Sequence, residues 1–227
     1  MAAPSTFAAL EATLGYQFKN SNLLATALTH RSVARDSGDI NNQRLEFLGD
    51  AVLGLVVADM LYHLFPGESE GDLSKRQVSL VNGEQLAEIA GTMQLGEQLR
   101  LSSGEDEQGG RENPSNLEDA CEALLGALYL DGGLEAVRAV VTKFWRAQAE
   151  AMRTPPKDPK TTLQEWAQGR SLPLPEYVVI SADGPSHAPH FVIEVRVQGK
   201  APLRGEAGTK KLAERLAATA MLATLKD

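Results

Sequence analysis

Thiols are scarce in this chain of 227 residues, which contains one cysteine, Cys121, and therefore no internal disulfide. A lone thiol is a poor ligand for a hard cation, so we expect Cys121 to fill a small buried space. The segment from Met1 to Tyr16 lacks a basic region and contains Glu11, so we expect no secretory signal. No apolar stretch is expected to reach the length that spans a bilayer. These absences predict a cytoplasmic protein without a membrane partner.

Basic residues are also fewer than acidic ones: the chain has 22 Lys and Arg and 30 Asp and Glu, and its formal net charge is −8. The deficit lies in residues 1–156, which hold 12 basic and 22 acidic residues, whereas residues 157–227 hold 10 and 8. We therefore expect phosphate contacts in the C-terminal part, at bound cations and at local basic residues such as Lys75 and Arg76. The polar segment 102–110 lacks the Gly-Lys-Ser/Thr ending of a nucleotide-binding loop, so no nucleotide cofactor is expected.

Three prolines lie within residues 154–159 and mark the best domain boundary. Proline removes a helical hydrogen bond and favours extended backbone, so we expect a partly stiff linker over 153–159. The chain is predicted to be multi-domain, with an all-α domain at 1–152 and a small α+β domain of order α-β-β-β-α at 160–227.

Apolar residues recur three and four positions apart throughout the first domain, a spacing typical of amphipathic helices. Ser21 and Ser115 are candidate N-caps, and the segments 65–67 and 131–133 carry helix-stop residues. The expected helices are 7–14, 21–29, 43–64, 71–93, 115–130 and 134–151, and 102–110 is expected to be a polar loop.

The periodicity changes in the second domain. Residues 176–180 are rich in strand formers, and in 191–197 the apolar residues at alternate positions share one face, opposite Glu194 and Arg196. A third strand is expected near 202–205, and helices at 161–168 and 209–226 enclose the three strands.

Two segments place pairs of carboxylates in otherwise apolar sequence. Glu46 and Asp50 are four residues apart, and Asp119 and Glu122 are three apart, so each pair shares a helix face. Eight uncharged residues follow each pair. Like charges on a mostly buried surface are unfavourable without a partner, and a hard divalent cation is the obvious partner for carboxylate oxygens.

The run from 42 to 53, Asn-Gln-Arg-Leu-Glu-Phe-Leu-Gly-Asp-Ala-Val-Leu, resembles the signature of the ribonuclease III family, the bacterial endonucleases that cut double-stranded RNA. The segment 117–133 is similar to that family's second acidic helix, and the blocks 29–32 and 70–75 match two further motifs in the expected order. The resemblance covers nearly the whole chain, and its first motif is highly specific.

This resemblance implies a site for Mg²⁺, with Mn²⁺ as a substitute, whose ligands are Glu46, Asp50, Asp119 and Glu122. Asp50 and Glu122 are then the expected catalytic residues. The implied reaction leaves 5′-phosphate and 3′-hydroxyl ends with short 3′ overhangs, in the processing of ribosomal RNA precursors and of some messenger and transfer RNAs. Family members form homodimers through the face around Phe47, although the sequence alone leaves Phe47 equally compatible with a core position.

The second domain resembles the double-stranded-RNA-binding domain, on segments 160–165, 184–187 and 208–214 together with Phe191. A-form RNA presents 2′-hydroxyls in a wide minor groove and phosphates along a deep major groove. Polar side chains of a helix and a loop suit the hydroxyls, and a lysine pair at a helix N-terminus suits phosphate. The expected RNA-binding residues are Lys160, Thr161, Gln164, Glu165, His187, Lys210 and Lys211.

One departure concerns Gln43, which stands where the family often has glutamate and so weakens any outer role of this position in cation or RNA contact. Glu70, in a block that matches another outer acidic position, is retained. His30 is expected to cap or pack rather than act as a general base, and the role of Arg44 is undetermined. Two alternatives are a non-cleaving double-stranded-RNA-binding protein and an unrelated helical metal phosphohydrolase. The complete set of four carboxylates favours the nuclease over the first, and the second leaves the C-terminal domain unexplained.

Overall fold

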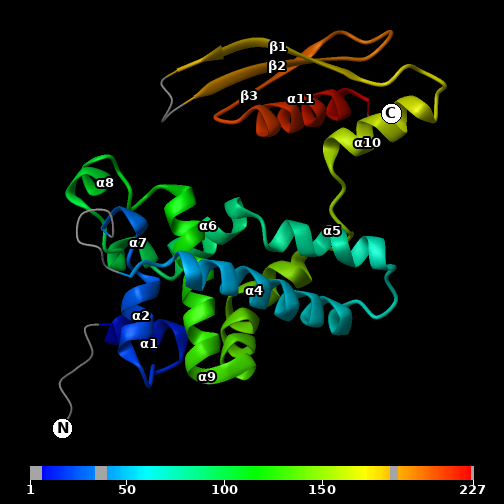
Figure 1. The fold of residues 1–227 in the computed structure, drawn as a ribbon. Helices are drawn as coiled ribbons and strands as arrows, with labels where there is room; N and C mark the ends of the chain where they lie inside the picture. Colours follow the sequence, from blue (N-terminus) through cyan, green and yellow to red (C-terminus); the bar gives the residue numbers. More distant parts are fainter. Residues whose placement is uncertain (1–6, 34–39, 185–188, 226–227) are drawn as a thin grey trace. The chain divides into compact units, whose positions relative to one another are not determined.

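The computed structural model describes residues 7–33, 40–184 and 189–225 (Figure 1). The chain divides into two compact units, Met1–Pro156 and Lys157–Asp227. The described part of the first unit is helical, and the second has a three-stranded sheet flanked by two helices. The predicted fold class, an all-α domain followed by an α-β-β-β-α domain, is confirmed.

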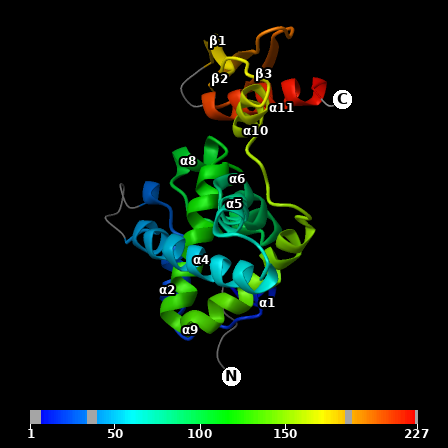
Figure 2. The same ribbon diagram turned by 90° about the vertical axis from the view of Figure 1, so that its right-hand side faces the viewer.

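Two long helices, α4 (Gln43–Leu64) and α9 (Pro114–Ala151), form the centre of the first unit and make its most extensive helix–helix contact (Figure 2). The other described helices of this unit are α1 (Ala8–Leu14), α2 (Ser21–Ala27), α5 (Glu70–Leu80), α6 (Gly83–Thr92), α7 (Leu95–Gln98) and α8 (Ser103–Glu107). The prediction of a loop over 102–110 was wrong in part, because α8 forms there with the Ser102 hydroxyl accepting a bond from the backbone N–H of Glu105.

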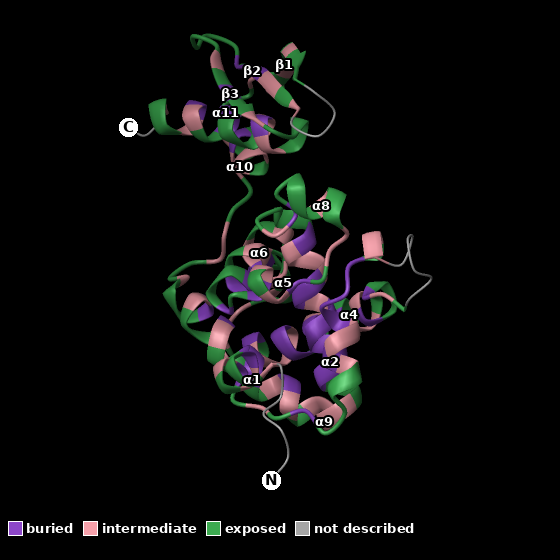
Figure 3. Ribbon diagram, turned by 90° about the vertical axis from the view of Figure 1, so that its left-hand side faces the viewer, coloured by how far each residue is buried: buried purple, intermediate pink, exposed green. Residues whose placement is uncertain are grey.

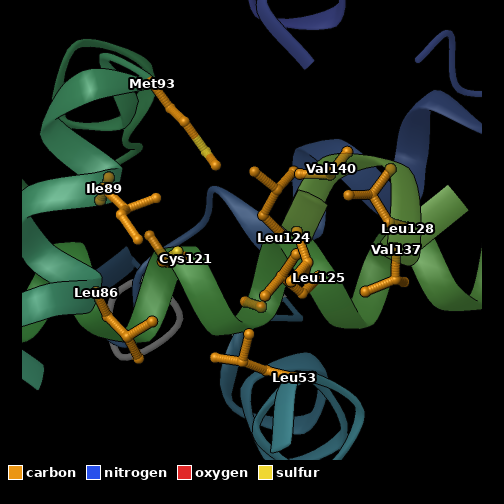
Figure 4. Packing of buried hydrophobic residues seen from close by; sticks show 14 of the residues in the cluster. Leu53, Leu86, Ile89, Met93, Cys121, Leu124, Leu125, Leu128, Val137 and Val140 are labelled. Carbon is orange, nitrogen blue, oxygen red and sulfur yellow. The ribbon is translucent and has the colours of Figure 1, made fainter. Parts of the chain in front are cut away.

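The core of this unit contains buried residues of α4, α6 and α9. Figure 3 colours the buried parts of the ribbon purple. Leu53 of α4 and Ile89 of α6 point toward α9, where they lie near Leu125 and Cys121 respectively (Figure 4). Cys121 is fully buried, and burial raises the pKa of its thiol. The predicted packing role of this cysteine is confirmed.

The helix expected over 71–93 is broken in two at Asn82, so that prediction was wrong. The Asn82 side-chain amide donates to the carbonyl of Ser79 at 2.7 Å, at the end of α5. Its side-chain oxygen accepts from the backbone N–H of Gln85 at 3.1 Å, which caps the start of α6. One asparagine therefore satisfies backbone groups of both helix ends, and this offsets the loss of helical hydrogen bonds.

The N-cap residues of two other helices also differ from the prediction, by one or two positions. Asn113, not Ser115, caps α9, and Asn20, not Ser21, caps α2, in each case by accepting a bond from a backbone N–H two residues later. The expected break between two helices at 131–133 appears within α9 as a kink at Gly133, whose φ of 73° and ψ of −171° are non-helical. A left-handed φ favours glycine at this position.

The expectation that no apolar stretch is long enough to span a bilayer was wrong for α4. Its 22 residues reach a mean hydropathy of 1.5 over the best window, which makes it the one helix among the described residues that is long and apolar enough by composition. One face of α4 is packed in the core, at Leu45, Val52, Leu53, Val56, Val57 and Leu61. Core helices of water-soluble proteins pass the same test of length and composition.

The second unit consists of α10 (Pro159–Gln168), β1 (Glu176–Asp183), β2 (His190–Arg196), β3 (Leu203–Ala207) and α11 (Lys210–Thr224). The strands form an antiparallel sheet in the order β1-β2-β3, with a register shift in β1 between Val179 and Ser181. Ile193, Val195 and Val197 are buried, as the alternating pattern predicted. A Cβ on Gly205 of β3 would lie 2.3 Å from the carbonyl oxygen of Ala213, so β3 packs directly on α11.

Candidate functional site

The two acidic segments meet where α4 crosses α9 in backbone contact. A Cβ on Gly49 of α4 would lie 1.8 Å from the carbonyl oxygen of Glu122, and a Cβ on Gly126 of α9 would lie 2.2 Å from the carbonyl oxygen of Leu45. Neither position accommodates a side chain unless the helices move apart. Because Glu46 and Asp50 flank Gly49, this crossing brings the two acidic pairs into one region.

Electrostatics show that the carboxylates interact. The pKa of Glu122 is raised to about 8, chiefly because burial desolvates the group, and then because of repulsion from Asp50, Glu118, Glu46 and Asp119. The pKa of Asp119 is also raised by desolvation, against a lowering effect from Arg31 and then His30. The four predicted ligands therefore lie within electrostatic reach of one another.

Glu46 also interacts with a carboxylate of α9: desolvation and then repulsion from Asp119 raise the pKa of Glu46, while Arg31 lowers it. Arg31 is exposed and acts on carboxylates of both helices. Sequence reasoning gave no role to Arg31 or to Glu118, although each adjoins a residue that it did single out. Their proximity to the site depends on how the helices pack, and spacing along the chain does not reveal it.

The donor set fits a hard divalent cation. Carboxylate oxygens are the ligands that such ions prefer, and the repulsion that raises the pKa of Glu122 is relieved when positive charge is added. Within the described ranges, no three His, Cys, Asp or Glu side chains are grouped closely enough to hold a metal ion together. The site therefore gathers the correct ligand chemistry without a preformed three-ligand cage.

His30 is buried, and its ring contacts Ser32, two residues later in the chain. Its Nδ1 lies 2.9 Å from the hydroxyl oxygen of Ser32, which in turn accepts a bond from the backbone N–H of Ser102 at 3.0 Å. These contacts tie the segment before α4 to the segment before α8. They agree with the packing role predicted for His30.

Arg76 is not available for phosphate, so the expectation that it adds to RNA affinity was wrong. The side chain is 1% exposed. It pairs with Glu68 through two hydrogen bonds, donates to the carbonyl of Met152 at 2.6 Å and lies over the Phe65 ring. Arg76 therefore links the C-terminal end of α9 to the turn between α4 and α5 through hydrogen bonds. Its neighbour Lys75 is exposed.

Phe47 lies on the surface of this chain, with 82% of the residue exposed. Leu55 and Tyr62, eight and fifteen residues further along α4, are 57% and 67% exposed. The three residues follow one face of the helix at heptad-like spacing. We call them the α4 stripe. An internal core position for Phe47 is excluded within the monomer.

In the second unit the predicted RNA-binding residues that the structure describes lie on two helices, along α10 and at the start of α11. Thr161, Gln164 and Glu165 are exposed on α10, and Lys210 and Lys211 are exposed in the first turn of α11. The backbone N–H groups of the first turn of α11 and its dipole add to the charge of the lysine pair.

Two of the predicted residues differ from this group. Lys160 is half-buried, with its ammonium 2.5 Å from the Glu214 carboxylate and 4.7 Å from the centre of the Tyr177 ring, so its charge joins α10 to α11. His187 lies outside the described residues.

Comparisons with known proteins agree with both halves of the chain. The family described as Ribonuclease-III-like matches residues 20–148, and the double-stranded RNA binding motif matches residues 159–225. The chain is 48% identical over 218 residues to Ribonuclease 3 of Ehrlichia ruminantium (strain Gardel), with 96% of each chain covered. It is 48% identical over 225 residues to Ribonuclease 3 of Azorhizobium caulinodans, which covers 98% of this chain and 96% of that one.

A solved structure of the nuclease domain of ribonuclease III from Campylobacter jejuni matches with a TM-score of 0.60 and 44% identity. It covers 63% of this chain and 97% of that one, and its description refers to structural flexibility in a region involved in dimer formation. High identity over nearly the full length, and a match to each domain in the expected order, lead to one conclusion: the chain belongs to the ribonuclease III family.

Proposed function

We propose that the protein is a Mg²⁺-dependent endoribonuclease that cleaves double-stranded RNA, with Glu46, Asp50, Asp119 and Glu122 as the cation ligands. The observation that carries this proposal is the backbone contact of α4 and α9 at Gly49 and Gly126, which gathers four mutually repelling carboxylates. Mn²⁺ is the expected substitute ion, because it shares the preference for oxygen ligands.

Bound Mg²⁺ would supply a nucleophilic water and stabilise charge on the leaving 3′-oxygen, which yields 5′-phosphate and 3′-hydroxyl ends. The chain's own contribution is to hold anionic oxygens on two rigid helices. Asp50 is exposed on α4, and the partly buried Glu122 faces it electrostatically from α9, so these two are the proposed catalytic residues. Burial of Glu122 lowers the local dielectric and strengthens its attraction for a cation.

The α4 stripe supports the proposal of a homodimer. Large apolar side chains that are more than half exposed along one helix face favour contact with a second copy, and C₂ symmetry matches the pseudo-twofold of duplex RNA. Two such sites, one per protomer, would cut the two strands and leave short 3′ overhangs.

Double-stranded RNA is the proposed partner of the second unit. The exposed polar side chains of α10 and the lysine pair of α11 suit hydroxyls and phosphates of A-form RNA. We also propose a cytoplasmic location, in keeping with a buried free cysteine, and a role in the processing of ribosomal, messenger and transfer RNA precursors.

Incubation with a long RNA duplex tests the function, in Mg²⁺ and in chelator. The wild-type protein is expected to produce short duplexes only with Mg²⁺, and Glu122→Gln is expected to bind duplex without cutting it. Binding by the wild-type protein without cleavage in Mg²⁺ or Mn²⁺ would instead support the non-cleaving RNA-binding alternative.

A further inference from the structure

Glu118 of α9 lies one residue before Asp119, and its carboxylate occupies space that Gly83 leaves open. A Cβ built on Gly83, the first residue of α6, would lie 2.4 Å from Oε2 and 2.7 Å from Oε1 of Glu118. The carboxylate therefore rests on the α6 backbone, and the residue is only partly exposed. A side chain at position 83 would displace it.

Glu118 precedes Glu122 by four residues in α9, so the two carboxylates lie on one face of the helix. In agreement with this placement, the charge of Glu118 contributes to the raised pKa of Glu122 on α9 and of Glu46 on α4. A further carboxylate in this region is unfavourable unless positive charge offsets it. Desolvation and then repulsion from Asp119 raise the pKa of Glu118 itself, and a divalent cation would offset this repulsion.

We propose that Glu118 is a positioning residue for the cation: its negative charge, held in place by Gly83, raises the affinity of the site from outside the four ligands. The proposal rests on the proposed function of those ligands. It explains the glycine at position 83, because the absence of a side chain there leaves room for the Glu118 carboxylate beside the α6 backbone. It also adds an anionic charge to a site where Gln43 is neutral.

Binding of Mn²⁺ to the full-length protein without RNA tests this role, with the electron paramagnetic resonance signal of free Mn²⁺ as the readout. Glu118→Gln is expected to raise the Kd about tenfold, the lower end of what loss of an outer partner of a metal site costs. The difference should shrink in about 0.5 M salt, because ions screen a charge that is not a ligand. Glu84→Gln is the matched control, since Glu84 is an exposed acid that follows Gly83 in the first turn of α6.

A second pair of variants moves the carboxylate without removing its charge. Gly83→Ala is expected to displace the Glu118 side chain and weaken Mn²⁺ binding several-fold. Gly91→Ala is its control, because Gly91 is exposed on the same helix and an added Cβ there meets nothing within 4 Å. Both changes favour helix formation, so a difference between them reports on the displaced carboxylate.

Glu122→Gln separates the two proposals. If it binds Mn²⁺ as the wild type does, the cation site itself is wrong. If it loses Mn²⁺ binding while Glu118→Gln keeps wild-type affinity at low salt, the role of Glu118 is refuted. Equal affinities of Gly83→Ala and Gly91→Ala, or a Glu118→Gln defect that high salt leaves unchanged, also overturn it. Thermal unfolding in chelator checks that each variant is folded.

Discussion

Replacement of Glu122 by glutamine is expected to stabilise the cation-free protein at alkaline pH and to change its stability little in acid. The pKa of this group rises from 4.5 to about 8 in the folded protein, through desolvation and then repulsion by four carboxylates. Between these two pH values the unfolded chain binds fewer protons than the folded protein, so the free energy of unfolding falls as pH rises. Above the folded pKa the full penalty is present.

The size of the effect follows from the shift. A change from 4.5 to about 8 corresponds at most to about 5 kcal/mol. Solvent and mobile ions screen a partly exposed carboxylate, so we expect on the order of 2 kcal/mol at alkaline pH. Glutamine keeps the size of the side chain and removes the charge, and it should recover most of this free energy.

Urea denaturation in chelator and low salt measures the free energy of unfolding at about pH 5 and about pH 9. Most of the titration of Glu122 in the folded and unfolded states falls between these two pH values. Glu112→Gln is the control, because Glu112 is an exposed acid before the start of α9. Equal stability of Glu122→Gln and wild type at alkaline pH would refute the reasoning, as would a gain of the same size at both pH values. Added Mg²⁺ should raise the free energy of unfolding of the wild type more than that of the variant, because an ion that binds only the folded state stabilises that state.

Three further changes test other parts of the structure. Gly49→Ala should destabilise the protein by about 2 kcal/mol or more, because the added Cβ would overlap a backbone carbonyl of α9. Gly54→Ala in the same helix is the control, since its Cβ would meet only a side chain, at 3.7 Å, and thermal unfolding should show a lower melting temperature for Gly49→Ala alone. Phe47→Ala should weaken self-association, measured by sedimentation equilibrium, and unchanged association would place the dimer contact elsewhere. Lys210→Ala combined with Lys211→Ala should weaken duplex binding about equally across RNA sequences and reduce its salt dependence, and a change in cleavage-site choice at constant affinity would contradict this.

Local sequence signals determined much of the secondary structure. The apolar periodicity and the Phe65-Pro66-Gly67 stop predicted both ends of α4, because each signal acts within one or two helical turns. The alternation over 191–197 predicted the burial of Ile193, Val195 and Val197, but not that of Glu194 on the opposite face, which pairs with Arg196 and Arg204. The break at Asn82 was missed, because its side chain bonds to two helix ends at once and periodicity carries no sign of such a cap.

For the site, the sequence determined which carboxylates share a helix face, since that depends only on a spacing of three or four residues. Only the tertiary structure decided that the two faces meet, because the contact depends on two glycines 77 positions apart in the chain, Gly49 and Gly126. The same holds for Glu118, whose place beside the start of α6 arises from packing across the fold. It also holds for Arg76, whose burial between Glu68 and Met152 no charge pattern along the chain could reveal.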